Sequence, residues 1–151
     1  MKTVGVLMII FSSFSLGLSY VNKMKKQINV LSDLLLFCNN LKTSISYQLV
    51  SINDFIQSID SDEYKNLDFL NEISDFDNIT LDLSKEENMR ISRFFSSLGK
   101  YDMKNQINEI EYFMAFLNSK LEERKSEFNQ KSKITMVLSF SVGAVISLVI
   151  M

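Results

Sequence analysis

The two ends of the chain are hydrophobic stretches without a charged residue, and they cover residues 3–22 and 134–151. A helix rises about 1.5 Å per residue, so roughly 18–20 residues cross the ~30 Å hydrocarbon layer of a bilayer. Both stretches have that length. We therefore predict two transmembrane helices, with a single domain over residues 23–133 between them.

Basic residues border both stretches on their inner sides. Lys23, Lys25 and Lys26 follow the first stretch, and Arg124, Lys125, Lys131 and Lys133 precede the second. Short segments rich in lysine and arginine remain in the cytoplasm. The charge pattern thus predicts a two-span protein of the cell membrane. Its middle domain is expected in the cytoplasm, and its termini on the far side.

Each end also has an alternative interpretation. The first stretch, preceded by Lys2, could be a cleaved signal peptide, although no clean small-x-small cleavage site comes before the lysine cluster. The second could be a buried core helix, although it is apolar around its whole circumference and globular helices normally keep a polar face. Its small residues would let it pair closely with another membrane helix. They are Ser139, Ser141, Gly143, Ala144 and Ser147.

The composition excludes several classes of function. The chain has no histidine and a single cysteine, Cys38, which rules out an internal disulfide and a histidine- or cysteine-based zinc site. We predict that Cys38, within an apolar run, is simply a small buried residue. A net charge of −2, without a basic tract that contains aromatics, argues against nucleic acid as a partner.

The middle domain has the periodicity of helices. Apolar residues recur every three or four positions in two segments. They are Ile28, Leu31, Leu35, Cys38, Leu41, Ile45 and Leu49, and then Ile107, Ile110, Met114, Leu117, Leu121 and Phe128. No proline occurs, and no breaker separates either segment from its neighbouring hydrophobic stretch. We predict an all-α fold: an antiparallel bundle of about five to six helices flanked by two transmembrane helices.

Shorter helices are indicated by capping signals. Ser51 with Asp54, and Ser84 with Glu87, have capping-box spacing, so we expect a helix to begin after each serine. The segment between them, from about residue 60 to residue 83, is less regular. Leu67, Leu70 and Ile73 allow one short helix there, and residues 75–82 are expected to form a loop.

That irregular segment is acidic. Its acids are Asp60, Asp62, Glu63, Asp68, Glu72, Asp75, Asp77 and Asp82. We interpret them as a solvated surface, because they lack the alternating ligand spacing and the glycine of a calcium loop. No metal site is predicted. The missing histidine removes the usual general base near pH 7, and the four glycines form no phosphate-binding loop. We therefore expect neither an enzyme nor a cofactor.

A turn near Gly99 is the candidate binding region. Gly99 is expected to end a helix in the left-handed conformation, and Asp102 to cap the next one. Gln106 is expected to form a hydrogen bond across the bundle or to a partner. Four basic residues surround the turn and favour an acidic partner surface, although an ordinary solvated corner has the same composition. They are Arg90, Arg93, Lys100 and Lys104.

The same turn carries a family resemblance. Leu98-Gly99-Lys100-Tyr101-Asp102, then Gln106 and Ile110, lead into a long amphipathic helix and a closing hydrophobic span. This pattern resembles the stage III sporulation protein AB family, and the likeness covers nearly the whole chain. In the first half, Leu31, Leu41, Ile45, Tyr47 and Ile52 fall where that family has a leucine-rich helix and a Glu-Ile-x-Tyr segment. The family is itself similar to the cytoplasmic helical module of type II secretion and pilus platform proteins.

The resemblance implies a structural part of the channel that links mother cell and forespore in endospore-forming bacteria. It implies a location in the mother-cell membrane around the forespore. The implied partners are the lipid bilayer, a hexameric ATPase of the stage III sporulation protein AA type, and other membrane subunits of the channel. A homo-oligomer is also compatible with it.

An alternative hypothesis comes from a different class of function. The small residues of the second stretch fit a holin-like pore former or a lipid-remodelling protein. The large middle domain, and the absence of a polar stripe in either stretch, argue against this alternative.

Overall fold

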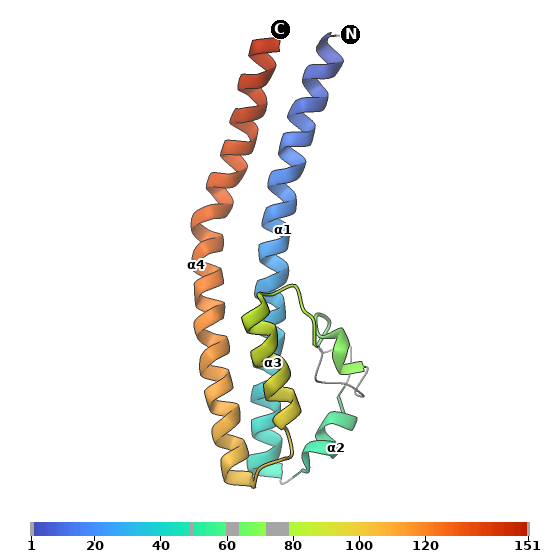
Figure 1. Ribbon diagram of the computed structural model, residues 1–151, viewed down its shortest axis with the longest axis vertical. Helices are drawn as coiled ribbons and strands as arrows, with labels where there is room; N and C mark the ends of the chain where they lie inside the picture. Colours follow the sequence, from blue (N-terminus) through green and yellow to red (C-terminus); the bar gives the residue numbers. More distant parts are fainter. Residues whose placement is uncertain (1, 49, 60–63, 72–78, 151) are drawn as a thin grey trace. The chain divides into compact units, whose positions relative to one another are not determined.

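The computed structural model describes residues 2–48, 50–59, 64–71 and 79–150, and Figure 1 shows its helices. The described residues form four α-helices: α1 (Lys2–Thr43), α2 (Ile52–Gln57), α3 (Lys85–Ser97) and α4 (Met103–Ile150). A π-helical segment, η1 (Ser44–Gln48), follows α1, and a 3-10 turn, η2 (Asp68–Asn71), follows α2. None of the described residues lies in a strand. The predicted all-α fold is confirmed.

The predicted number of bundle helices, about five to six, is wrong for the described residues, which contain four α-helices in total. α1 and α4 are single continuous helices, because neither contains a proline or a turn. In its described part, the irregular segment between α2 and α3 contributes only η2. Leu67 and Leu70 are buried there, and Ile73 lies outside the described residues.

The chain divides into two compact units. The first combines Met1–Lys26 with Glu123–Met151, and the second is Gln27–Glu122. The helices α1 and α4 contribute residues to both units. The sequence-based boundaries, after residues 22 and 133, mark the ends of the predicted membrane spans and stay a prediction.

The first unit contains its own charged contacts. The Nζ atom of Lys25 lies 5.9 Å from the centroid of the Phe128 ring. Glu127 forms ion pairs with Arg124 at 3.8 Å and with Lys131 at 3.4 Å, one turn away on either side. Among the residues that the structure describes, no helix is sufficiently long and apolar to span a bilayer.

The core of the second unit is built around α1. The predicted stripe residues Leu31, Cys38 and Leu41 are fully buried, but so are Leu34 and Phe37. A single stripe buries only about every third or fourth residue. The buried face of α1 is wider than that, because residues of α2, the segment around η2, α3 and α4 all belong to the same core cluster.

Aromatic rings join these elements. The Phe37 ring on α1 lies 5.7 Å from Phe55 on α2, 5.9 Å from Tyr64 and 5.2 Å from Phe95 on α3, measured between centroids. Such edge-on and tilted pairs stabilise a core beyond their buried area. From α1, the Phe37 ring therefore contacts α2, the segment before η2, and α3.

Two polar contacts fasten the segment before η2 to α1. The Asp33 Oδ2 atom accepts hydrogen bonds from the backbone and side-chain nitrogens of Asn66, at 3.1 and 2.8 Å. The Asn40 side chain donates to the Tyr64 hydroxyl at 2.8 Å. These contacts order a segment that has little helical periodicity. Most of the predicted acidic loop, including Asp60, Asp62, Glu63, Glu72, Asp75 and Asp77, lies outside the described residues.

Candidate functional site

A capping box fixes the start of α3. The Ser84 hydroxyl accepts from the Glu87 backbone N–H at 3.2 Å, and the Glu87 carboxylate accepts from the Ser84 N–H at 2.8 Å. This confirms the prediction from the Ser84 and Glu87 spacing. With this register, α3 buries Ile91, Phe94 and Phe95. The face that carries Met89, Ser92, Arg93 and Ser96 remains accessible.

A tight turn joins α3 to α4. Gly99 has φ 77°, and a Cβ added to it would meet nothing within 4 Å. The glycine is therefore required for its backbone conformation and not for space. Asp102 directly precedes α4, and its carbonyl oxygen accepts from the Gln106 N–H at 2.8 Å.

Gln106 lies inside this turn. Its side chain is only 1% exposed, and its Oε1 atom accepts from the Gly99 backbone N–H at 2.9 Å. The Nε2 atom of Gln106 has no hydrogen-bond partner among the described residues. The side chain thus joins the first turn of α4 to the end of α3, and it does not lie on the protein surface.

The four basic residues occupy different surroundings. The Arg90 guanidinium lies 4.3 Å from the centroid of the Phe116 ring on α4, as a cation–π pair. Arg93 and Lys100 line a groove of about 950 Å³ along α3. Arg90 and Arg93 also line a smaller hollow of about 320 Å³ with Glu86 and Glu109. Lys104 is exposed and lines neither cavity.

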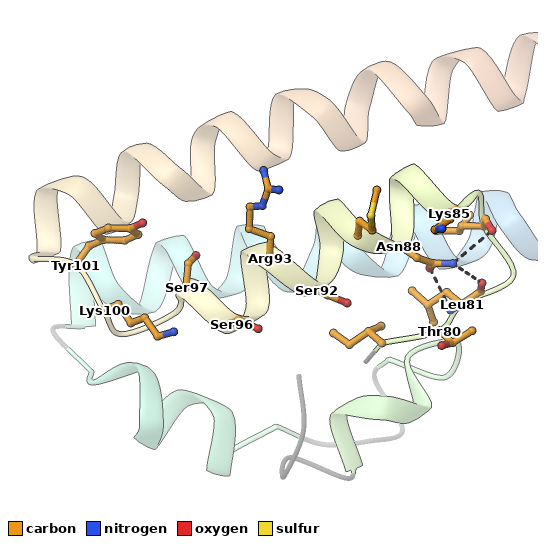
Figure 2. A pocket seen from close by; sticks show the side chains of 13 residues that line it. Thr80, Leu81, Lys85, Asn88, Ser92, Arg93, Ser96, Ser97, Lys100 and Tyr101 are labelled. Atoms are coloured by element: carbon orange, nitrogen blue, oxygen red, sulfur yellow. Dashed lines mark hydrogen bonds between the residues drawn. The ribbon is translucent and has the colours of Figure 1, made fainter. Parts of the chain in front are cut away.

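The larger groove runs along α3, and Figure 2 shows the side chains that line it. Lys85 lies at the beginning of the helix, and Lys100 and Tyr101 come from the turn beyond its end. Ser92 and Ser96 lie between these ends. The opposite wall is formed by the segment before α3 and contains Ile79, Thr80, Leu81 and Leu83.

A side-chain clamp holds that wall against α3. Asn88 accepts from the Leu81 backbone N–H at 3.1 Å, and its Nδ2 atom donates to the Leu81 carbonyl at 3.0 Å. The same Nδ2 also lies 3.4 Å from the Leu83 carbonyl. Because the segment has no regular secondary structure, these bonds replace the backbone pairing it lacks. The groove therefore has a defined wall.

Met89 and Tyr101 are groove residues that the sequence interpretation did not identify. They are 56% and 52% exposed, which is high for large hydrophobic side chains. The sequence did contain a signal for Met89. This residue falls outside the apolar stripe of α3 defined by Ile91, Phe94 and Phe95, which predicts that it is exposed. Tyr101 lies in a turn, where periodicity gives no information.

Comparison with known proteins decides the family. The sequence model described as stage III sporulation protein AB matches residues 2–77 and 70–151. The chain belongs to the stage III sporulation protein AB family. No curated protein and no solved structure matches it significantly. Membership in the stage III sporulation protein AB family implies a role in stage III of sporulation.

The structure gives a physical account of the residues that carried the resemblance. Gly99 provides the left-handed turn, Asp102 precedes α4, and Gln106 closes the turn from within. Ile110 is fully buried in the core. No group of three or more histidine, cysteine, aspartate or glutamate residues in the described ranges could hold a metal ion.

Proposed function

We propose that this member of the stage III sporulation protein AB family is a membrane-anchored structural adaptor. Its helical bundle docks a hexameric ATPase of the stage III sporulation protein AA type and connects it to a channel between mother cell and forespore. One observation carries the proposal: α1 and α4 each continue without a break from the bundle into an uncharged end segment. A continuous helix transmits a displacement along its axis, because its backbone hydrogen bonds are not interrupted.

Membrane attachment through residues 3–22 and 134–151 is supported by the absence of charge in both stretches. On α4, Ile134, Val137 and Leu138 are 59%, 65% and 57% exposed. Neighbouring apolar side chains with this exposure are typical of surfaces that contact lipid or a partner. The inner basic clusters support a cytoplasmic bundle.

Docking of the ATPase is supported by the basic surface at the end of α3. Arg93 and Lys100 share one groove, and Arg90 lies beside Arg93 in the adjacent hollow. Clustered basic residues steer an oppositely charged partner and fix its orientation. No acidic residue is among the described residues that line the larger groove.

The docking proposal is tested with the full-length chain in detergent and the purified ATPase. Reversing Arg90, Arg93, Lys100 and Lys104 to glutamate together is expected to abolish co-purification. A control carries Lys65→Glu, since this lysine is exposed and lines neither cavity. The control is expected to bind like wild type. Unchanged co-purification of the fourfold variant would remove the basic surface as the ATPase site.

Sidedness is tested by labelling with a membrane-impermeant maleimide. The native Cys38 is buried, so it adds little background in the folded chain. The chain is produced in vegetative cells, so that the far side of its membrane is the cell exterior. A cysteine at the exposed Ser119 is expected to react only after these cells are permeabilised, whereas a cysteine at Lys2 is expected to react in intact cells. Labelling of Ser119→Cys from outside would invert the proposed topology and leave no access for a cytosolic ATPase.

A further inference from the structure

Among the described residues that line the groove along α3, the charged ones are all basic. They are Lys85, Arg93 and Lys100. None of the three forms an ion pair with a described residue. Cations without an ion-pair partner among the described residues can pair with an anionic partner from outside the chain. The occupant that complements the described lining is therefore anionic.

The groove also presents apolar contacts that a small anion would leave unused. Met89 and Tyr101 are both more than half exposed, and methionine and tyrosine are among the residues enriched in protein interfaces. The wall adds Leu81 and Leu83. An occupant that satisfies the whole lining needs apolar and acidic side chains together, which points to a protein segment.

The length and surface of α3 favour a helical segment. With 13 residues at about 1.5 Å each, α3 is about 20 Å long, so a partner helix could lie along it for about that length. Ser92 and Ser96 are one helical turn apart, and Figure 2 shows them on the groove side of α3. Their small side chains allow a second helix to approach closely.

The groove is held at both ends before any partner arrives. Asn88 fastens the wall to α3 through Leu81, and Gln106 fastens the turn that carries Lys100 and Tyr101. A site that is already ordered loses less conformational entropy on binding. This preorganisation distinguishes the groove from a solvated patch of long side chains.

We propose that this groove is the docking site for an acidic amphipathic helix of the partner. Acidic side chains of that helix face Lys85, Arg93 and Lys100, and its apolar stripe contacts Met89 and Tyr101. The proposal deepens the proposed function, and it rests on that function for identifying the partner as the ATPase. The chemistry of the binding segment is inferred from the lining of the groove and is independent of the proposed function.

The first experiment fills the groove of the full-length chain with a large side chain. Ser92→Trp places an indole between the wall and α3, and Ser119→Trp places the same side chain on an exposed position of α4 outside the groove. We expect Ser92→Trp to weaken ATPase binding about tenfold or more, and Ser119→Trp to leave it unchanged. Circular dichroism verifies the fold. A second variant, Lys85→Glu with Lys100→Glu, tests the groove by charge if Ser92→Trp loses helicity.

The outcomes separate the two proposals. If the ATPase binds wild type and both groove variants equally, the groove proposal is wrong and the adaptor function stands. If the ATPase does not bind wild type, the adaptor function is wrong, and a peptide experiment decides on the groove alone. If Ser92→Trp changes the oligomeric state in sedimentation, a second copy of the chain occupies the groove and the proposal is overturned.

The peptide experiment uses the full-length chain and two designed helical peptides of about 13 residues. Both carry leucine on one face, with glutamate elsewhere in the first and lysine in the second. We expect only the glutamate peptide to bind, with about tenfold weaker binding to Ser92→Trp and loss of binding at high salt. Equal binding of the two peptides contradicts the proposal. The proposal is also contradicted if the glutamate peptide binds only after Glu72, Asp75 and Asp77 have been replaced by neutral residues. The chain's own acids would then compete with the peptide for the groove.

Discussion

The backbone N–H of Gly99 donates a hydrogen bond to Oε1 of Gln106 at 2.9 Å, across the turn that joins α3 to α4. Gly99 is exposed and has φ 77°, whereas the Gln106 side chain is almost fully buried. The turn therefore depends on two features: the left-handed backbone of Gly99 at the surface and the buried side-chain amide of Gln106. Both residues position Lys100 and Tyr101 at the end of the groove.

Replacing Gln106 with alanine is expected to destabilise the bundle. The variant leaves the Gly99 N–H without its acceptor and creates a cavity, at a cost of about 1–3 kcal/mol in the free energy of unfolding. The measurement is urea unfolding followed by circular dichroism. Asn108→Ala, on an exposed position of the same helix, is the control and is expected to change stability by less than about 0.5 kcal/mol. Equal effects of the two variants would contradict a structural role for Gln106.

Substitutions of Gly99 test whether the glycine is required for its backbone conformation or because a side chain would not fit. Alanine has room at this position but disfavours a positive φ, so Gly99→Ala is expected to cost about 1–2 kcal/mol. Gly99→Asn is expected to cost less, because asparagine adopts the left-handed region more readily. The two variants are compared with wild type by chemical unfolding. If alanine and asparagine are equally destabilising, the cost does not come from φ.

The contacts of the Phe37 ring lead to a prediction about the core. Phe37→Ala removes contacts with Phe55, Tyr64 and Phe95 at once and is expected to cost about 3–5 kcal/mol in unfolding free energy. The neighbouring Leu36 is 40% exposed, so Leu36→Ala serves as a control with an expected cost of about 1 kcal/mol or less. A Phe37→Ala protein as stable as the control would show that the aromatic cluster does not hold α2 and α3 to α1.

The sequence predicted the parts of the fold that local rules determine. The apolar spacing of α4 gave Ile110, Leu117 and Leu121, all of which are buried. The Ser84 and Glu87 spacing gave the start of α3, and Ser51 gave the start of α2. These features depend on residues within one or two helical turns of each other. Periodicity and capping chemistry report such short-range relationships directly.

The groove and the anchoring of the irregular segment were not predictable in the same way. The pairs Asp33–Asn66 and Asn40–Tyr64 join residues that are 33 and 24 positions apart. Their spacing follows no local rule, because it depends on the packing of the segment against α1. The basic residues were visible in the sequence, but their separation was not. The packing of α3 on α4 places Arg90 over Phe116, and the segment before α3 forms the wall of the groove that Arg93 and Lys100 line.

This separation predicts a graded effect of single charge reversals on ATPase binding. Lys100→Glu and Arg93→Glu are expected to weaken binding more than Lys104→Glu, since Lys104 lines neither cavity. The dissociation constant is measured at low and at physiological salt, where screening reduces the differences. Equal losses for all three variants would indicate a diffuse electrostatic contribution and no localised site.

Above neutral pH, the change of stability with pH is expected to depend on ionisation of the Cys38 thiol. Burial raises the pKa of the Cys38 thiol well above its ordinary value of about 9. In the unfolded chain the thiol ionises near the ordinary value, whereas in the folded chain it remains protonated. The stabilising contribution of the neutral thiol is therefore fully present below about pH 9 and is lost as the pH rises further, by at most about 1.4 kcal/mol per pH unit.

A comparison with Cys38→Ala isolates this effect. Contributions from all other groups are common to both proteins and cancel in the difference between them. That difference in unfolding free energy is expected to be constant between about pH 7 and 8.5 and to shrink above about pH 9. The same burial predicts that a thiol reagent modifies Cys38 only after urea unfolds the chain. A difference that stays constant to about pH 10.5, or rapid modification of the folded chain, would show that the thiol is accessible to solvent and that α1 is not packed as described.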